Sequence, residues 1–212
     1  PAFAGEVPAA GGARQAQPKM GPALRALEEG ILHGEVSVTQ IKAERPMLLY
    51  NSGPVQLPVH RASSMVGELA PLELWIKHLL APGDLLVIDE PEAHLHPENQ
   101  RLVAKVLVRL VRAGVRVLCT THSSIIIHQL SNHLLASEGD AEAMKAAKFT
   151  KDDLLKPDDV NVYLFEVGAD GTHVKPLEIE PGWGISEDEF VRVAEAMGEE
   201  TSRLSRASAR TG

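Results

Sequence analysis

The chain has 212 residues, of which 44% are hydrophobic and 24% are charged, and its formal net charge at pH 7 is −8. This composition is that of a globular protein with one domain of ordinary size. The negative charge argues against a chain that binds nucleic acid over its whole surface, because phosphate contacts need clustered Lys and Arg; a local basic patch stays open, but nothing indicates one. Cys119 is the single cysteine, so no intrachain disulfide can form. No apolar run approaches the roughly 20 residues that span a bilayer, and we expect a cytoplasmic protein without a membrane partner.

The N-terminal quarter combines a segment without periodicity and short β-rich pieces. Residues 1–20 are rich in Ala, Gly and Pro, so we expect a flexible segment there. The chain begins with Pro1 and not with Met, which suggests a partial chain. Residues 22–30 predict a short helix that ends at a glycine. From residue 31 to 60, the β-rich pieces predict antiparallel strands joined by a turn.

The middle of the chain has the pattern of a parallel β-strand, helix and strand. Residues 65–80 have helical periodicity interrupted by Pro71, which implies either a start near residue 70 or a bend. The continuous apolar run at 84–89 predicts a strand buried on both faces. A helix and a second buried strand at 115–121 follow, and together they predict a right-handed βαβ unit.

The C-terminal third predicts smaller elements around this unit. Residues 137–159 are polar and indicate a surface insertion. Two β-rich runs around an Asp-Gly pair predict a hairpin. A capping box predicts an acidic helix over 187–198, and residues 199–212 are expected to form a mobile tail.

Two adjacent carboxylates, Asp89 and Glu90, end the first buried strand. In open α/β sheets, ligands bind at the carboxyl ends of the strands. Neighbouring residues on a strand point to opposite sides, so one carboxylate can hold Mg²⁺ while the other orients or deprotonates a water. The alternative is that both are solvated residues at a strand end.

Histidines offer two further interpretations. His122 ends the second buried strand, so it can lie near Glu90 and contact a phosphate; the alternative is a polar residue in a turn. His94 and His96, with Glu92 or Asp89, suggest a metal-dependent hydrolase instead. A catalytic zinc site usually takes three protein ligands, and no third histidine is anchored nearby.

Three stretches in a fixed order are more specific than any of these residues alone. The stretches SSMVGEL, LLVIDEPEAHLHP and LCTTHSS resemble the second half of an ABC-type ATPase head. The wording DEPEAHLHP is characteristic of the bacterial RecF/SMC-like ATPases that include the overcoming-lysogenization-defect (OLD) family and AAA-labelled relatives. The resemblance implies an α/β fold over residues 21–198. This fold is a partial ABC-ATPase head with a parallel βαβ core, flanking antiparallel strands, and a C-terminal β-hairpin plus helix.

The resemblance also implies roles for residues in the three stretches. Asp89 matches the Walker B aspartate that supports Mg²⁺, and Glu90 matches the carboxylate that polarises the hydrolytic water. His122 matches the switch histidine that senses the γ-phosphate. Ser63 and Ser64 match the signature motif, which reaches ATP bound to the opposite subunit.

The sequence departs from the family pattern at two residues and lacks three of the family's elements. Met65 replaces the usual glycine after the serine pair, and Gly67 follows two residues later. His96 replaces the aspartate common in the D-loop of ABC transporters. The chain contains no G-x-x-x-x-G-K-[ST], and the Q-loop and a Toprim nuclease domain are also not identifiable. We therefore expect the C-terminal half of an ATPase.

The implied function is Mg²⁺-dependent ATP binding and hydrolysis, with the P-loop supplied by another segment or chain. The implied partners are ATP and either a second copy or a partner ATPase half, which would be contacted through the signature motif and D-loop. The alternative is a non-catalytic interaction or regulatory module that completes a partner's nucleotide site.

Overall fold

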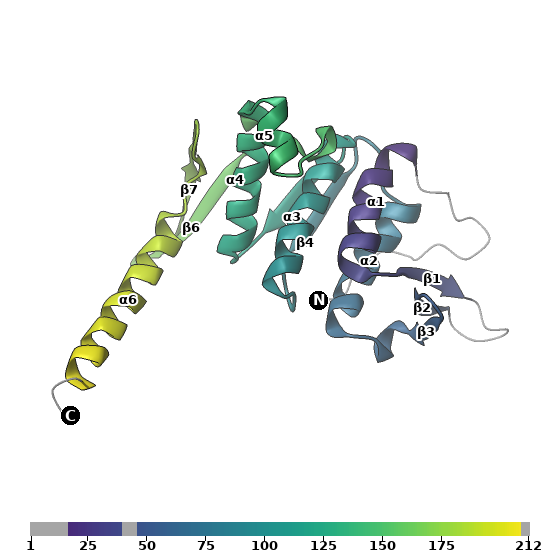
Figure 1. Ribbon diagram of the computed structural model, residues 1–212, viewed down its shortest axis with the longest axis horizontal. Coiled ribbons are helices and arrows are strands. Elements are labelled where there is room, and N and C mark those ends of the chain that lie inside the picture. Colours follow the sequence, from purple (N-terminus) through teal and green to yellow (C-terminus); the bar gives the residue numbers. More distant parts are fainter. Residues whose placement is uncertain (1–16, 40–45, 209–212) are drawn as a thin grey trace.

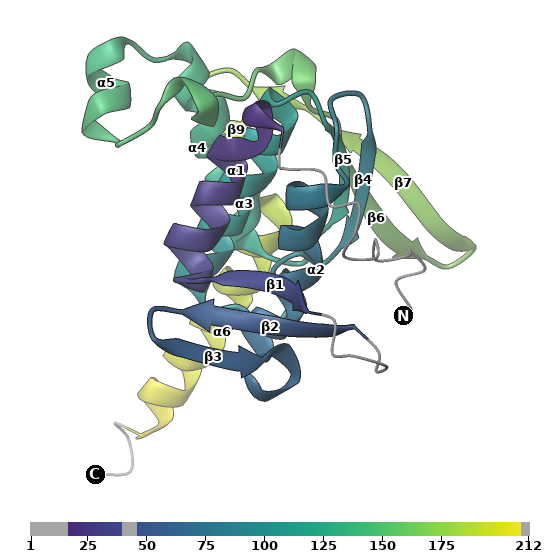
Figure 2. The same cartoon turned by 90° about the vertical axis from the view of Figure 1, so that its right-hand side faces the viewer.

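The computed structural model describes residues 17–39 and 46–208 (Figure 1). The parallel strands β4 and β5 lie at its centre, and α1 to α4 lie on one side of them (Figure 2). The fold is α/β with separate parallel and antiparallel sheets, as the sequence predicts. The site described below is built where the two parallel strands end.

The elements in the described residues are short, and most are joined by tight loops. The α-helices are α1 (Gly21–Leu27), α2 (Ser64–His78), α3 (Pro97–Arg112), α4 (Ser124–Glu138), α5 (Ala141–Ala146) and α6 (Asp188–Ser208). The strands are β1 (Glu35–Thr39), β2 (Met47–Ser52), β3 (Val55–Pro58), β4 (Leu85–Asp89), β5 (Arg116–Thr120), β6 (Val162–Gly168), β7 (Gly171–Leu177), β8 (Ile179–Glu180) and β9 (Gly184–Ile185). Five single-turn helices complete the chain: η1 (Pro18–Met20), η2 (Glu28–Leu32), η3 (Val59–Arg61), η4 (Lys151–Asp153) and η5 (Pro157–Asp159).

The N-terminal helical segment is longer than the sequence predicts. It runs without a break from η1 through α1 and η2, and it ends where His33 adopts a left-handed φ of 51°. The predicted stop at Gly30 is wrong, because Ile31 is buried in the core and holds the last turn against it. Of the segment expected to be flexible, residues 1–16 lie outside the described residues, whereas Met20 is fully buried.

The predicted antiparallel strands are confirmed as the sheet β1-β2-β3. A buried charge network attaches this sheet to α2. The Glu73 carboxylate is fully buried and accepts hydrogen bonds from the Val36 backbone N–H at 2.8 Å and from Lys77 Nζ at 2.6 Å. Lys77 also pairs with Glu28 Oε1 at 2.7 Å. Because a buried charge is costly unless it is paired, these contacts fix the sheet, η2 and α2 to one another.

Helix α2 begins at Ser64 and continues through Pro71, so of the two alternatives that the sequence left open, the late start near residue 70 is wrong. The Ser63 side chain accepts a hydrogen bond from the Val66 backbone N–H, which caps the first turn. Burial of Val66 and Leu69 holds the turns before the proline against the core.

The predicted βαβ unit is confirmed. Strands β4 and β5 pair in parallel with α3 between them, and Asp89 lies opposite Thr120 at the carboxyl end. The expectation that both strands are buried on both faces is wrong. Leu86 is 1% exposed, whereas Leu85 and Val87 are 53% and 56% exposed. The helices cover one face only, and the other face presents apolar side chains to solvent.

The predicted surface insertion is anchored by a buried carboxylate. Asp153 is fully buried and accepts a hydrogen bond from Arg109 Nε on α3 at 2.7 Å and one from the Thr150 backbone N–H at 2.8 Å. Although burial opposes ionisation, the Arg109 guanidinium and the Thr150 hydrogen bonds lower the pKa of Asp153 to about 2. The insertion is therefore fastened to α3 and is not a loose surface loop.

The C-terminal elements include the predicted hairpin and a helix longer than expected. Strands β6 and β7 pair antiparallel and close at Gly168 and Gly171. Helix α6 continues to Ser208, so the segment from residue 199 that was expected to be mobile is helical up to that point. An Arg203–Glu199 pair at 2.8 Å, one helical turn apart, supports the added turns.

Candidate functional site

The site is built where β4 and β5 end side by side. The hydroxyl of Thr120 donates a hydrogen bond to the Asp89 carboxylate. The Glu90 backbone N–H lies 3.2 Å from both the Thr120 hydroxyl and the Thr120 carbonyl oxygen. Thr120 therefore orients the aspartate and extends the strand pairing by one residue. Both carboxylates remain exposed.

The backbone turns sharply at Glu90. Its φ is 43°, in the left-handed region that residues with a Cβ seldom adopt. Strained backbone of this kind persists where surrounding contacts hold it, and it is common at functional sites. Here the contacts with Thr120 hold the residue, and the turn directs the following loop away from the strand.

The structure brings His122 to Glu90. His122 Nε2 lies 3.6 Å from Glu90 Oε1, and the two side chains are 87% and 49% exposed. This is close enough for a charge interaction but longer than a good hydrogen bond. The two groups therefore border one solvent-facing space at the strand ends, as the sequence predicts for adjacent strands.

Glu92 connects the loop after β4 to the loop after β5. Its Oε1 accepts hydrogen bonds from the Thr121 hydroxyl at 2.6 Å and from the His122 backbone N–H at 2.9 Å. Its Oε2 is buried and has no hydrogen-bond partner among the described residues. The Glu92 side chain therefore fixes the position of the His122 backbone relative to the loop after β4.

The role of Glu92 was missed by sequence reasoning, which considered it only as a metal ligand. No signal in the sequence located this role, because the chain turns sharply at Glu90, and Glu92 is buried whereas Glu90 is exposed. Burial together with the Glu92 charge raises the pKa of the Cys119 thiol. Cys119 is therefore held as a neutral thiol beneath the site.

The residues predicted to form the signature motif lie at the start of α2. Ser63, Ser64 and Gly67 are all exposed there. Met65, which replaces the expected glycine, accepts a hydrogen bond at its sulfur from Asn99 Nδ2 at 3.0 Å. Asn99 belongs to the first turn of α3, so this contact places the start of α2 beside the start of α3.

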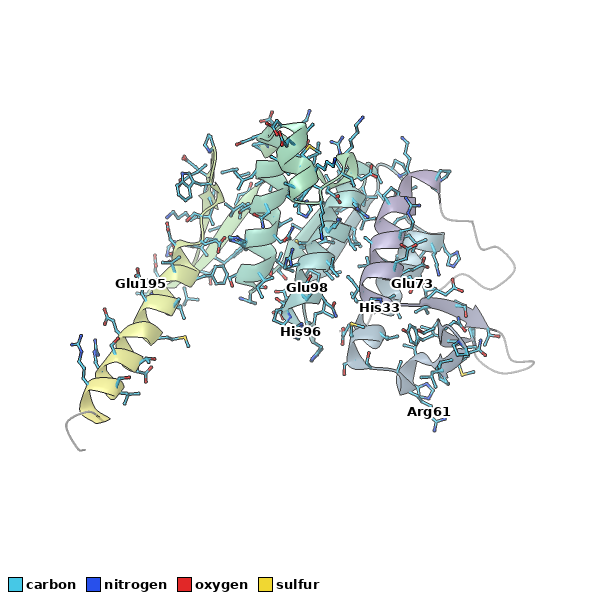
Figure 3. The ribbon with its side chains drawn as sticks, viewed as in Figure 1. His33, Arg61, Glu73, His96, Glu98 and Glu195 are labelled. Carbon is cyan, nitrogen blue, oxygen red and sulfur yellow. The ribbon has the colours of Figure 1, made fainter. Side chains whose placement is uncertain are left out.

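The loop histidines have separate structural roles. His96 is the N-cap of α3, and its Nδ1 lies 3.4 Å from the Glu98 backbone N–H; both labelled side chains lie at the start of that helix (Figure 3). His94 adopts a φ of 59° and is exposed. Within residues 17–39 and 46–208, no three His, Cys, Asp or Glu side chains are grouped to hold a metal, so the geometry gives the zinc interpretation no support.

The fold and parts of the sequence match known nucleotide-binding proteins. A protein-family model described as "AAA domain, putative AbiEii toxin, Type IV TA system" matches residues 34–127. The Nod factor export ATP-binding protein I of Cupriavidus metallidurans is 31% identical over 103 residues. That alignment covers 49% of this chain, and the chain spans only 30% of the relative's length.

Two solved structures share the fold at low sequence identity. One is described as "Structural biochemistry of ATP-driven dimerization and DNA stimulated activation of SMC ATPases". It has 13% identity and a TM-score of 0.50, and it covers 84% of this chain and 92% of that chain. The other is an SmcHead bound to the C-winged helix domain of ScpA, with 12% identity and a TM-score of 0.50. That match covers 77% of this chain and 42% of the SmcHead chain. Among the helices of the described residues, none is long and apolar enough to cross a membrane.

Proposed function

We propose that this chain, which is similar to ABC- and SMC-like AAA ATPases, supplies the hydrolytic half of a Mg²⁺-dependent ATP site. The observation that carries this proposal is the approach of His122 Nε2 to within 3.6 Å of Glu90 Oε1. This approach occurs beside Asp89, where two parallel strands end. The position is the one at which open α/β sheets bind ligands.

The carboxylate of Asp89 fits a Mg²⁺ ion. It is a hard oxygen donor, it is exposed at the strand end, and the Thr120 hydroxyl orients it. Asp89 would hold the ion directly or through water. When bound, Mg²⁺ neutralises charge on the transferring phosphate.

The chain's own residues would then act on water and phosphate. The Glu90 carboxylate would accept a hydrogen bond from the attacking water, orient it in line with the γ-phosphate and take its proton as the new P–O bond forms. The His122 ring would donate a hydrogen bond to a γ-phosphate oxygen, from a position set by Glu92. Asp89, Glu90 and His122 would thus each contribute one exposed group around the same solvent-facing space at the strand ends.

The phosphate cradle would come from residues outside these 212, in the same polypeptide or another chain. The sequence contains no G-x-x-x-x-G-K-[ST]. The exposed face of the parallel sheet supports the proposal, because Leu85, Val87 and Leu118 are 53%, 56% and 58% exposed. Contiguous exposed apolar surface of this kind is typical of an interaction site, and the P-loop half would cover it here.

Two such heads would close around ATP. One of the two solved structures is described in terms of ATP-driven dimerization of SMC ATPases, and in this chain the starts of α2 and α3 lie side by side through the Met65–Asn99 contact. We place Ser63, Ser64 and Gly67 at the γ-phosphate of ATP held by the opposite head, and His96 at the contact between heads. From the stretch DEPEAHLHP, we also propose that this chain is related to the OLD family.

A second candidate function is a non-catalytic module that completes a partner's nucleotide site. The missing P-loop favours it. In that case Glu90 and His122 would not take part in turnover, although the module would still bind the same partner surface.

Reconstitution tests the proposal against this alternative. The chain is mixed with a polypeptide that carries the P-loop half, and phosphate release is measured for each component and for the mixture. We expect hydrolysis only in the mixture, and loss of hydrolysis when His122 is replaced by Ala. Turnover that persists with His122→Ala would support the non-catalytic module.

A further inference from the structure

Helix α6 leaves the body of the protein. Glu187, just before the helix, is held by His128 Nδ1 on α4 at 2.8 Å, and the helix then extends outward as far as Ser208 (Figure 1). Every side chain from residue 191 to 206 is exposed. Helices in proteins draw most of their stability from the packing of an apolar face rather than from intrinsic helix propensity. The helix therefore needs a surface to pack against.

The apolar residues of α6 follow a seven-residue repeat. Phe190, Met197 and Leu204 are spaced by seven residues; Val193 lies between the first two, and Glu200 occupies the corresponding position between the last two. Val193, Met197 and Leu204 are 54%, 63% and 64% exposed. A seven-residue apolar repeat is the pattern of helices that wind around each other in a left-handed supercoil. The face consequently fits another helix better than a flat sheet.

The charges beside this stripe specify the orientation of the partner helix. Glu189 and Arg203 are fourteen residues apart, so they occupy the same flanking position of the repeat. In an antiparallel pair of identical helices this flank faces itself, which sets Glu189 of one copy against Arg203 of the other. In a parallel pair the flank would face Ala194 and Thr201, which carry no charge.

We propose that α6 pairs antiparallel with α6 of a second copy of this chain, with the crossing point at Met197. Phe190 of one copy then lies level with Leu204 of the other, because each lies seven residues from the centre. Glu189 and Arg203 pair at both ends of the contact. In the single chain these charges have exposed local partners, Arg192 and Glu199, and exposed pairs of this kind exchange at little cost.

Sedimentation equilibrium of the full chain without nucleotide or Mg²⁺ tests this contact separately from the ATP-driven one. We expect a reversible dimer whose dissociation constant rises at least about tenfold in Met197→Glu. Val191→Glu is the matched control, because Val191 is 50% exposed but lies on the outer side of the repeat. Circular dichroism and thermal unfolding report whether each variant keeps the fold of the body.

Charge reversal tests the antiparallel orientation. Glu189→Arg and Arg203→Glu should each weaken the dimer, and the double variant should restore it. A chain that stays monomeric at all concentrations, a dimer that is indifferent to Met197→Glu, or a double variant no better than the singles would overturn the proposal. Each of these results leaves the ATPase assignment standing.

Discussion

Glu92 joins the two loops of the site through a single carboxylate oxygen. That oxygen accepts hydrogen bonds from the Thr121 hydroxyl and from the His122 backbone N–H. Hydrogen bonds to charged groups contribute roughly 1.5–3 kcal/mol each. We therefore predict that Glu92→Ala increases amide hydrogen exchange at His122 about 10- to 100-fold and lowers ATP turnover in the reconstituted enzyme.

Two substitutions serve as controls for this prediction. Glu92→Gln keeps an acceptor oxygen and should restore most of the protection at His122. Glu98→Ala removes an exposed carboxylate that pairs only with Arg101 among the contacts in the structure, and it should leave exchange at His122 unchanged. If Glu92→Ala left the His122 amide as protected as before, the positioning role would be wrong.

The Asp153 carboxylate predicts how stability depends on pH. Its pKa is about 2 in the folded chain, against an ordinary value of 3.8. A depressed carboxylate pKa contributes stability that is present above the unfolded value and is lost as pH falls through the folded value. We predict that about 2 kcal/mol of the free energy of unfolding is lost between pH 5 and pH 2 through this group.

Chemical unfolding at a series of pH values checks the Asp153 prediction. Asp153→Asn should be less stable than the natural chain at pH 6, because Arg109 then loses its buried partner, and it should lose less stability on acidification. Equal pH dependence in the two proteins would assign the acid sensitivity to other carboxylates.

At the scale of the element, the two faces of β4 differ sharply. Leu86 is 1% exposed and Leu85 is 53% exposed, so the same substitution at neighbouring positions tests both faces. We predict that Leu86→Ala costs about 2–5 kcal/mol, as is usual for a fully buried leucine. Leu85→Ala should cost less than about 1 kcal/mol in this chain.

A substitution at Leu85 should have a larger effect once the P-loop half is present, because it should then weaken the binding of that half. If that half covers the exposed face of the sheet, Leu85→Glu should weaken its binding while leaving the unfolding of the single chain almost unchanged. Binding that is insensitive to Leu85→Glu, measured by titration calorimetry, would place the partner elsewhere.

Several elements were predictable because local pattern determines them. The continuous apolar run of β4, the periodicity of α3 and the Asp-Gly turn of the β6–β7 hairpin each predict the observed structure. The exposed face of β4 was not predictable, because an apolar run does not show whether anything covers the strand. The continuation of the first helix past Gly30 was also missed, since burial of Ile31 against distant residues outweighs the local stop signal.

At the scale of the whole molecule, the exposed groups of the candidate site could be predicted from the sequence, but the contacts that orient them could not. Asp89, Glu90 and His122 follow from strand ends and motif wording, and the structure places them around one space. The Thr120 and Glu92 contacts that orient them depend on how two loops meet in space, and sequence spacing does not determine that meeting.

The most direct test of the central claim is ATP turnover by the enzyme reconstituted with its P-loop half, comparing Glu90→Gln with Glu98→Gln. Glutamine keeps the size of Glu90 but cannot take a proton from water, and a general base contributes at least about 100-fold to the rate. The account predicts that Glu90→Gln lowers turnover about 100-fold or more while ATP stays bound between paired heads, and that Glu98→Gln behaves like the natural chain. Turnover unchanged by Glu90→Gln would contradict the assignment of this chain as the hydrolytic half of the site.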